Sequence, residues 1–384
     1  EIIGLTRIFK NSPQLFIADQ MIKGGSIFAN IDLYFNDKGN LARNFSINGS
    51  VKDGEIRLIN KKKISKIDFN FDIQDGQYLL ENAEIEYEKT KLSSNKIKIK
   101  NKDNSFLFDG DFSSSKAEIN SSLLALIFKS NLKKKGFDNI NFTTNNNFSF
   151  ILSKKIKISD FKINSKINLH KLIYSKNNDS LKKFIPNYNN IIELIDHKID
   201  LSFDKKKFTI KGNGKFLIDE KTDKINYEIK HSNDKYNFKS QIKLDNIPLK
   251  IELFNYTKKE NENSSLNFAG VYNKNKNIYL QNISLKESEN NFKIKGVSLN
   301  KNYKINSIEE VSLNFLNDNK KKNKILLQKN KKNYELSGKI FDGTYLLNEL
   351  LNSENEGNPF DILNKFDSIV KINLTQVFID DINY

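Results

Sequence analysis

The chain has 384 residues, a formal net charge of +16 and no cysteine, so disulfide frameworks, thiolate metal sites and cysteine nucleophiles are excluded. Aromatic residues make up 11% of the chain, which is too many for an intrinsically disordered protein. The charge would suit a nucleic acid or an anionic membrane, but lysines scattered along the chain and a near absence of arginine favour a solvated, lysine-rich sheet face.

A two-residue alternation of apolar and polar side chains runs through most of the chain. The segments 66–73 and 96–100 show it most clearly. Successive side chains of a β-strand point to opposite faces, so this alternation predicts strands with one apolar and one polar face. We expect about twenty strands, joined by short turns, in a long antiparallel sheet.

The first part of the chain, residues 1–175, is predicted to be a β segment with two helices. Ser12 as N-cap and Pro13 at the first helical position predict a helix that continues to Lys23. Strands follow, with a turn expected at 52–54, before a second helix at about 121–135 and further strands to 174.

The second part begins with a predicted helical interruption at 176–197, broken by Pro186. The two-residue period then returns over 198–343, where the pair Gly212 and Gly214 is expected to form a bulge or bend. The last part, 344–384, is predicted to hold short helices at 344–351 and 359–366 and a final strand.

The apolar side of so large a sheet needs a cover, and a sandwich, a closed barrel or a curled groove would each provide one. The few short helices cannot cover it. We therefore predict a mostly β protein in which a long, curled antiparallel sheet forms an elongated apolar groove, with a few short helices. A folded-over β-sandwich is the alternative.

The expected floor of the groove consists of apolar residues at alternate positions of three strands, where lipid acyl chains would lie. These residues are Phe69, Phe71, Ile73, Phe161, Ile163, Ile167, Leu169, Phe208 and Ile210.

Residue patterns that carry catalysis are missing. The three histidines are far apart, and no nucleophile elbow, nucleotide-binding loop or metal-binding motif occurs. Pairs of acids such as Asp109 and Asp111 fall on one face of a strand, where solvated carboxylates are usual. We therefore expect no catalytic, metal or cofactor site, and a protein that is not an enzyme.

The order of elements in the first 130 residues resembles that of the bacterial AsmA-like envelope proteins, in particular the YhdP-type branch. The resemblance rests on Met21–Gly25, Ile31–Leu33, Phe45–Gly49, Asp53–Leu58, Ile67–Phe71 and Tyr78–Ala83. It implies a β groove in the periplasm that carries phospholipid acyl chains between the inner and outer membranes, without catalysis and without nucleic acid.

The membrane helix typical of that family does not occur here, since no apolar run reaches 18 residues. The sequence begins at Glu1 and ends within a strand-like pattern, so we expect a piece of a longer protein whose other part is anchored in the inner membrane. The alternative hypothesis is a structural or interaction protein of the envelope, built as a β-sandwich or β-solenoid.

Overall fold

The computed structural model describes residues 20–39, 45–57, 63–74, 77–87, 90–102, 105–119, 136–155, 157–177, 179–351 and 369–379. The chain divides into two units. Unit 1 comprises Glu1–Asn120, Asn141–Leu169 and Asp200–Lys205, and unit 2 comprises Ser121–Ile140, His170–Ile199 and Lys206–Tyr384.

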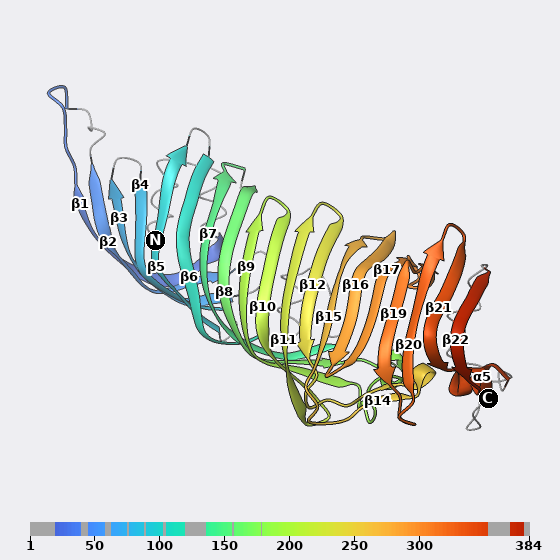
Figure 1. Ribbon diagram of the computed structural model, residues 1–384. Coiled ribbons are helices and arrows are strands. Elements are labelled where there is room, and N and C mark those ends of the chain that lie inside the picture. Colours follow the sequence, from blue (N-terminus) through green and yellow to red (C-terminus); the bar gives the residue numbers. More distant parts are fainter. Residues whose placement is uncertain are drawn as a thin grey trace. The chain divides into compact units, whose positions relative to one another are not determined.

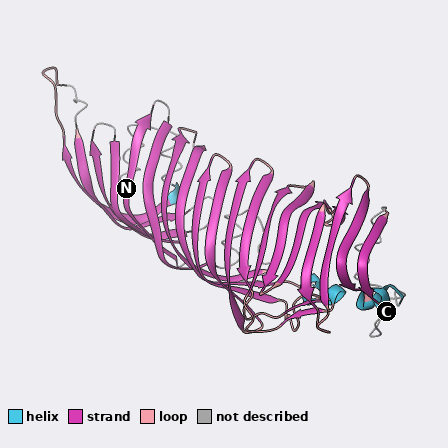
Figure 2. Cartoon of the chain, viewed as in Figure 1, coloured by secondary structure: helices cyan, strands magenta, loops and turns pink. Residues whose placement is uncertain are grey.

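Strands make up most of the described chain (Figures 1 and 2). The first eight are β1 (Ile22–Asp32), β2 (Ser46–Arg57), β3 (Lys63–Gln74), β4 (Gln77–Tyr87), β5 (Thr90–Lys102), β6 (Ser105–Ile119), β7 (Phe137–Ser153) and β8 (Ile158–Ser175). The next seven are β9 (Ile191–Asp204), β10 (Lys207–Ile218), β11 (Lys221–Ser232), β12 (Lys235–Lys243), β13 (Leu249–Ile251), β14 (Tyr256–Lys258) and β15 (Ser264–Asn273). The last are β16 (Asn277–Glu287), β17 (Asn290–Asn300), β18 (Ile305–Ser307), β19 (Glu310–Leu316), β20 (Lys322–Asn330), β21 (Asn333–Asp342) and β22 (Val370–Phe378).

One sheet takes in twenty of these strands, and β13 pairs with β14 in a separate hairpin. Neighbouring strands pair antiparallel, for example β2 with β3 and β10 with β11, whereas β22 runs parallel to β21. Helices in the described residues are short: α4 (Asp179–Lys182), the 3-10 helix η2 (Glu252–Phe254) and α5 (Thr344–Leu351). The prediction of a mostly β, largely antiparallel sheet with few helices is confirmed, and among the described strands this sheet does not close on itself.

One turn and one helix end predicted from sequence lie inside strands. The predicted turn at 52–54 is a bulge within β2, where the register against β3 shifts between Val51 and Gly54. Asp53 has a positive φ of 51°, and its N–H donates to Oδ1 of Asp68 at 2.7 Å, which satisfies the backbone group that the bulge frees. Residues 22–25, predicted as the end of the first helix, belong to β1.

The helical interruption predicted at 176–197 is wrong over its second half, because residues 191–197 belong to β9. Ile192 and Leu194 are two residues apart, which is the period of a strand, and both pack against the core of unit 2. The helix predicted at 344–351 is confirmed as α5, and the final strand as β22. The helices expected at 121–135 and 359–366, and most of the one at 12–23, lie outside the described residues.

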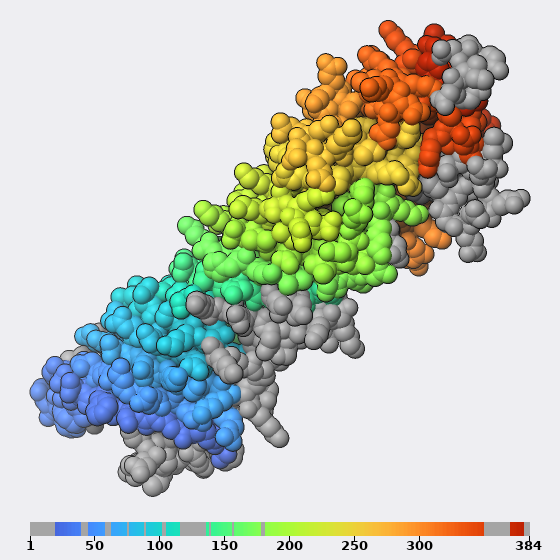
Figure 3. Space-filling model, turned by 90° about the horizontal axis from the view of Figure 1, so that it is seen from below, coloured from blue at the N-terminus to red at the C-terminus, as the bar shows by residue number. Residues whose placement is uncertain are grey.

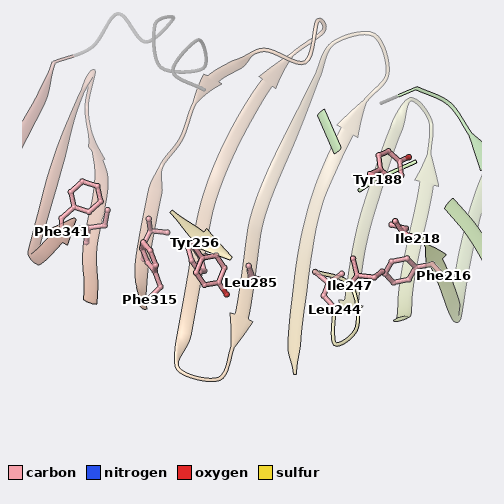
Figure 4. Packing of buried hydrophobic residues seen from close by; sticks show 12 residues of the cluster. Tyr188, Phe216, Ile218, Leu244, Ile247, Tyr256, Leu285, Phe315 and Phe341 are labelled. Atoms are coloured by element: carbon pink, nitrogen blue, oxygen red, sulfur yellow. The ribbon is translucent and has the colours of Figure 1, made fainter. Parts of the chain in front are cut away.

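A hydrophobic core occupies one end of the strands of unit 2 (Figure 4). Its buried side chains include Phe216 and Leu285 from the sheet and Tyr256 from β14. The β13–β14 hairpin with η2, here called the cap, covers this end of the sheet, and Phe254, Tyr256, Phe292 and Phe315 pack with ring centroids 4.6–6.3 Å apart. In the view from below, the described atoms of unit 2 form a continuous surface over this end of its strands (Figure 3).

Candidate functional site

An unbroken row of apolar side chains crosses nine strands of unit 1, and is here called the outer row. In order from β1 to β9 its members are Ile31, Ile47, Ile73, Tyr78, Ile99, Phe108, Phe150, Phe161 and Phe203. Directly opposed residues of neighbouring strands lie on one face of a sheet, so the strand register places the first six together.

Ring contacts continue the outer row beyond β6. Phe108 stacks on Phe150 with centroids 4.6 Å apart and ring planes 8° from parallel. Phe161 lies 6.5 Å from Phe150 and 5.9 Å from Phe203. Strands lie about 4.8 Å apart, so the row is roughly 40 Å long, whereas the acyl chains of one leaflet span about 15 Å. The outer row is therefore long enough to hold more than one lipid.

The apolar face of unit 1 is incompletely buried. Ile67 and Leu169, at 8% and 5% exposure, are the only buried apolar residues among those of unit 1 that the structure describes. Phe161 remains 39% exposed and Ile31 57% exposed. Unit 2 differs, because its core side chains are covered by the cap. The unit 1 face is thus the part of the described sheet best suited to contact an apolar ligand.

The floor residues predicted from sequence fall on strand faces as expected. Phe69, Phe71 and Ile73 alternate with exposed residues on β3 and are half-buried. On β8, Ile163 and Ile167 are half-buried, Leu169 is buried and Phe161 is exposed. Phe208 and Ile210 lie in unit 2, on the same face of β10 as the core residues Phe216 and Ile218.

A second row, here called the rim row, crosses the strands of unit 2 at the end away from the cap. In register order its members are Phe208, His231, Tyr236, Tyr272, Ile278, Leu299 and Ile305. The His231 ring lies 4.8 Å from the Phe208 ring and 4.4 Å from the Tyr236 ring, between centroids. Aromatic side chains with one polar atom suit a boundary between apolar and aqueous surroundings.

The opposite face of unit 1 is polar and carries a hollow of about 470 Å³, lined by residues that include Lys96, Lys98, Asp109, Asp111 and Lys162. Asp111 accepts the N–H groups of Asn95 and Lys96 at 3.0 and 2.9 Å, where the β5–β6 register is irregular. Lys96 and Lys162 form ion pairs with Glu81 and Asp204. The acids therefore hold a bulge and balance lysines, as solvated sheet faces do.

On the polar face of unit 2, Glu228 is surrounded by three lysines. Its carboxylate lies 2.6 Å from Lys239, 3.1 Å from Lys230 and 3.8 Å from Lys211. The hydrogen bonds from Lys239 and Lys230 lower the pKa of Glu228 to about 2. This group is an anchor between β10, β11 and β12 and has no apolar neighbour of the kind a lipid site requires.

The glycine pair in β10 makes room for two rings, and its expected bulge is wrong. The β10–β11 register is continuous through Gly212 and Gly214. The Tyr227 ring lies over Gly212 and the His197 ring over Gly214. His197 Nε2–H donates to the carbonyl oxygen of Lys215 at 2.8 Å, and Tyr227 Oη lies 3.3 Å from Nδ1. Burial lowers the pKa of His197 and raises that of Tyr227 to about 12.

Beneath the cap lies a group of buried polar side chains. The Asp223 carboxylate accepts the backbone N–H groups of Asp245, Asn246 and Ile247 at 2.9–3.2 Å. Lys258 is fully buried, and its Nζ donates to the carbonyl oxygens of Asp245 and Ile247 at 2.8 and 3.0 Å. Burial lowers the pKa of Lys258. These bonds fasten the cap to the sheet, and the buried atoms offer no access to a substrate.

A hydrogen bond between two carboxyl groups also lies at the cap. The bond to Glu287 raises the pKa of Glu262. Burial alone would raise the pKa of Glu287, but hydrogen bonds from Glu262, Tyr256 and Asn290 bring it below its ordinary value. The two carboxyl groups thus interact across the contact between β16 and the loop before β15.

In comparisons with known proteins, no family model, no curated protein and no solved structure matches the chain. Within the described ranges, no cluster of histidine and acidic side chains is arranged to hold a metal ion. None of the helices in those ranges has the length and hydropathy needed to cross a bilayer.

Sequence reasoning missed most of the outer row, although it found Ile73 and Phe161. Which residues face each other depends on the register between strands, and alternation within one strand does not determine it. A usable signal is symmetry about a turn: Ile73 and Tyr78 lie at equal distances from one turn, and Ile99 and Phe108 lie at equal distances from the next turn at the same sheet edge. The cap was missed because β13 and β14 have three residues each.

Proposed function

We propose that this chain binds phospholipid acyl chains on its apolar sheet face and acts as a non-enzymatic lipid-transfer protein between the inner and outer membranes of a bacterial envelope. Acyl chains would lie along the outer row in a groove-like arrangement, while head groups stay in water. This is the mode of action that the resemblance to AsmA-like proteins implies, and it would place the protein in the periplasm.

The observation that carries the proposal is the outer row with its incomplete burial. Leaving large apolar side chains in water forgoes about 25 cal/mol for each Å² that burial would remove from solvent. A contiguous exposed apolar patch on a soluble domain marks a binding surface more often than a solitary exposed residue does. Acyl chains can cover such a row without any directional contact, because the hydrophobic effect needs none.

Polar side chains on the apolar face of unit 1 also agree with a protein that binds lipid without catalysis. The buried polar residues Thr144 and Asn146 bond to each other at 3.0 Å, and Asn146 donates to the carbonyl oxygen of Phe112. The internal pairing of Thr144 and Asn146 leaves these two side chains occupied by structure, so a ligand near them would be held by shape and apolar contact.

The first experiment is mass spectrometry of lipids extracted from protein purified from bacteria without detergent. We expect more than one phospholipid molecule per chain. The test variant combines Phe71→Asp with Ile73→Asp, because a carboxylate against hydrocarbon costs several kcal/mol. The control combines Asn70→Asp with Gln74→Asp, which adds the same charge to exposed positions of β3.

We expect the test variant to lose bound lipid and to stop transferring fluorescent phospholipid between vesicles, with an unchanged circular dichroism spectrum, while the control keeps both properties. Unmodified protein that is soluble and free of lipid would contradict the proposal and favour a structural or interaction protein of the envelope. Transfer that survives in a folded test variant would show that β3 is not part of the lipid path.

A further inference from the structure

At one edge of unit 2, the hairpin turns that lie away from the cap (Figure 1) carry lysines and almost no acidic residues. This basic edge consists of Lys206, Lys207, Lys235, Lys274, Lys276, Lys301, Lys304, Lys331 and Lys332, all of them exposed. Asp234 is the one acidic residue within these turns.

The opposite edge of unit 2 has a different charge pattern. Asp219, Glu220, Glu289 and Asp318 lie in its turns, and Lys221 and Lys321 form ion pairs with Glu260 and Asp342. No ion pair within the described part of the chain engages the basic edge. Its positive charge is therefore uncompensated by neighbouring carboxylates.

The turns of the basic edge are close enough to act together. Each hairpin adds two strands, so successive turns lie about 10 Å apart. The Debye length is also about 10 Å at 0.1 M salt, and the fields of neighbouring turns overlap at that ionic strength. An anionic group moving along this edge would meet a continuous positive potential.

Four of these five turns adjoin the apolar rim row along the chain, the exception being the turn with Lys331 and Lys332. Lys206 lies two residues before Phe208, and Lys274 two residues after Tyr272. Lys276 precedes Ile278 by two residues, and Lys301 follows Leu299 by two. Lysine charge is thus placed within one side-chain length of an aromatic and aliphatic strip, the pairing found where proteins meet the head-group region of lipids.

We propose that unit 2 adds a second surface to the lipid-binding outer row: acyl chains also lie on the rim row, where the basic edge makes the protein selective for lipids with net-negative phosphate head groups. The inference rests on the proposed function and names its substrate class. Lysine holds phosphate as a point charge, without the fixed two-bond geometry of arginine, so each contact is exchangeable as a lipid moves.

The test offers the full chain an equimolar mixture of phosphatidylglycerol and phosphatidylcholine vesicles with identical dioleoyl chains, and measures both lipids in the reisolated protein. We expect at least about fivefold enrichment of phosphatidylglycerol, since each lysine near an anionic lipid contributes about 1 kcal/mol before screening. The enrichment should fall toward unity in 0.5 M salt.

The edge variant combines Lys274→Gln, Lys276→Gln and Lys301→Gln. The control combines Lys224→Gln, Lys243→Gln and Lys286→Gln, which removes equal charge from exposed positions on the polar face. We expect the edge variant to bind lipid with little preference for head group and the control to keep the enrichment.

Equal uptake of the two lipids by unmodified protein, or enrichment that persists in the edge variant, would overturn the inference while leaving lipid binding intact. Uptake of neither lipid would instead overturn the proposed function itself. A different result would assign the basic edge to nucleic acid. If a fluorescent single-stranded oligonucleotide binds through the same lysines and the protein takes up both lipids without a head-group preference, the inference is overturned.

Discussion

The imidazole ring of His197 fills the space above Gly214, where every other amino acid would have its β-carbon. A Cβ atom at Gly214 would lie 2.3 Å from Cδ2 of His197 and 2.7 Å from its backbone Cα. At Gly212, a Cβ atom would lie 2.4 Å from the Tyr227 hydroxyl oxygen. The two glycines therefore let a hydrogen-bonded pair of rings, tilted by 37° to each other, lie close to the backbone on the apolar face of unit 2.

The substitution Gly214→Ala should destabilise the protein by about 2 kcal/mol or more, because the new methyl group meets backbone as well as the ring. Urea unfolding followed by circular dichroism measures the change. Gly24→Ala is the control, since its nearest neighbour would be Cβ of Glu55 at 3.9 Å. Equal stability of the two variants would show that His197 can move away at no cost.

The buried His197 should make stability depend on pH below about 6.5. Burial lowers the pKa of His197 in the folded state, whereas the unfolded chain has the ordinary value of about 6.5. The unfolded chain therefore binds a proton first as pH falls, and the free energy of unfolding decreases from pH 6.5 down to the folded-state pKa. Above pH 6.5 both states are neutral and the effect vanishes.

Urea unfolding at pH 7.5 and pH 5.5 tests this dependence in the unmodified protein and in His197→Gln. We expect the variant to be less stable at pH 7.5 but to lose less stability on acidification. A variant with the same difference between the two pH values as the unmodified protein would contradict the assignment. Carboxylates interfere little, since their ordinary pKa values lie near 4.

Local structure could be predicted from this sequence better than long-range structure. The alternation in 66–73 depends only on neighbours in the chain, and it correctly predicted β3 and its apolar face. The parallel pairing of β22 with β21 depends on how residues 352–368 connect the two parts of the chain. The residue pattern of a single strand does not determine this pairing. The bulge at Asp53 looked like a turn because the residues that allow positive φ occur in both.

The sequence predicted that the candidate site is an apolar sheet face, but it predicted only some of the residues and contacts of that face. Phe161 was named from alternation alone, yet its contacts with Phe150 and Phe203 required knowledge of which strands are neighbours. His197 was expected at a helix end, and its burial under Tyr227 follows from strand pairing that places two glycines beside it. Residues whose role comes from a partner far along the chain are those that sequence patterns miss.

Glu228 should contribute stability that is lost in acid. Hydrogen bonds from Lys239 and Lys230 lower its pKa to about 2, below its unfolded value. Its contribution is therefore present above about pH 4.5 and is lost as pH falls toward 2, because the unfolded chain takes up the proton first. Added salt should weaken the contribution, since the lysines are exposed.

Thermal unfolding of Glu228→Gln at pH 6, 4 and 3 tests this contribution. The variant should be less stable than the unmodified protein at pH 6 and should approach it at pH 3. Glu335→Gln, at an exposed position of β21, is the control and should run parallel to the unmodified protein. A Glu228→Gln curve that also stays parallel would mean that the three lysines do not act on Glu228 in solution.

Photo-crosslinking can locate a bound lipid on one face of β8. Phe161 lies in the outer row and is 39% exposed, whereas its neighbour Lys162 points to the opposite face and pairs with Asp204. A benzophenone amino acid at Phe161 should form a covalent adduct with acyl chains of co-purified phospholipid, detected as a mass increase of the intact protein. The same group at Lys162 should give no adduct. Adjacent residues of one strand differ in little except the face they occupy. Equal yields at the two positions would therefore place lipid on both faces of the sheet. An adduct at Lys162 alone would show that the binding surface is the polar face.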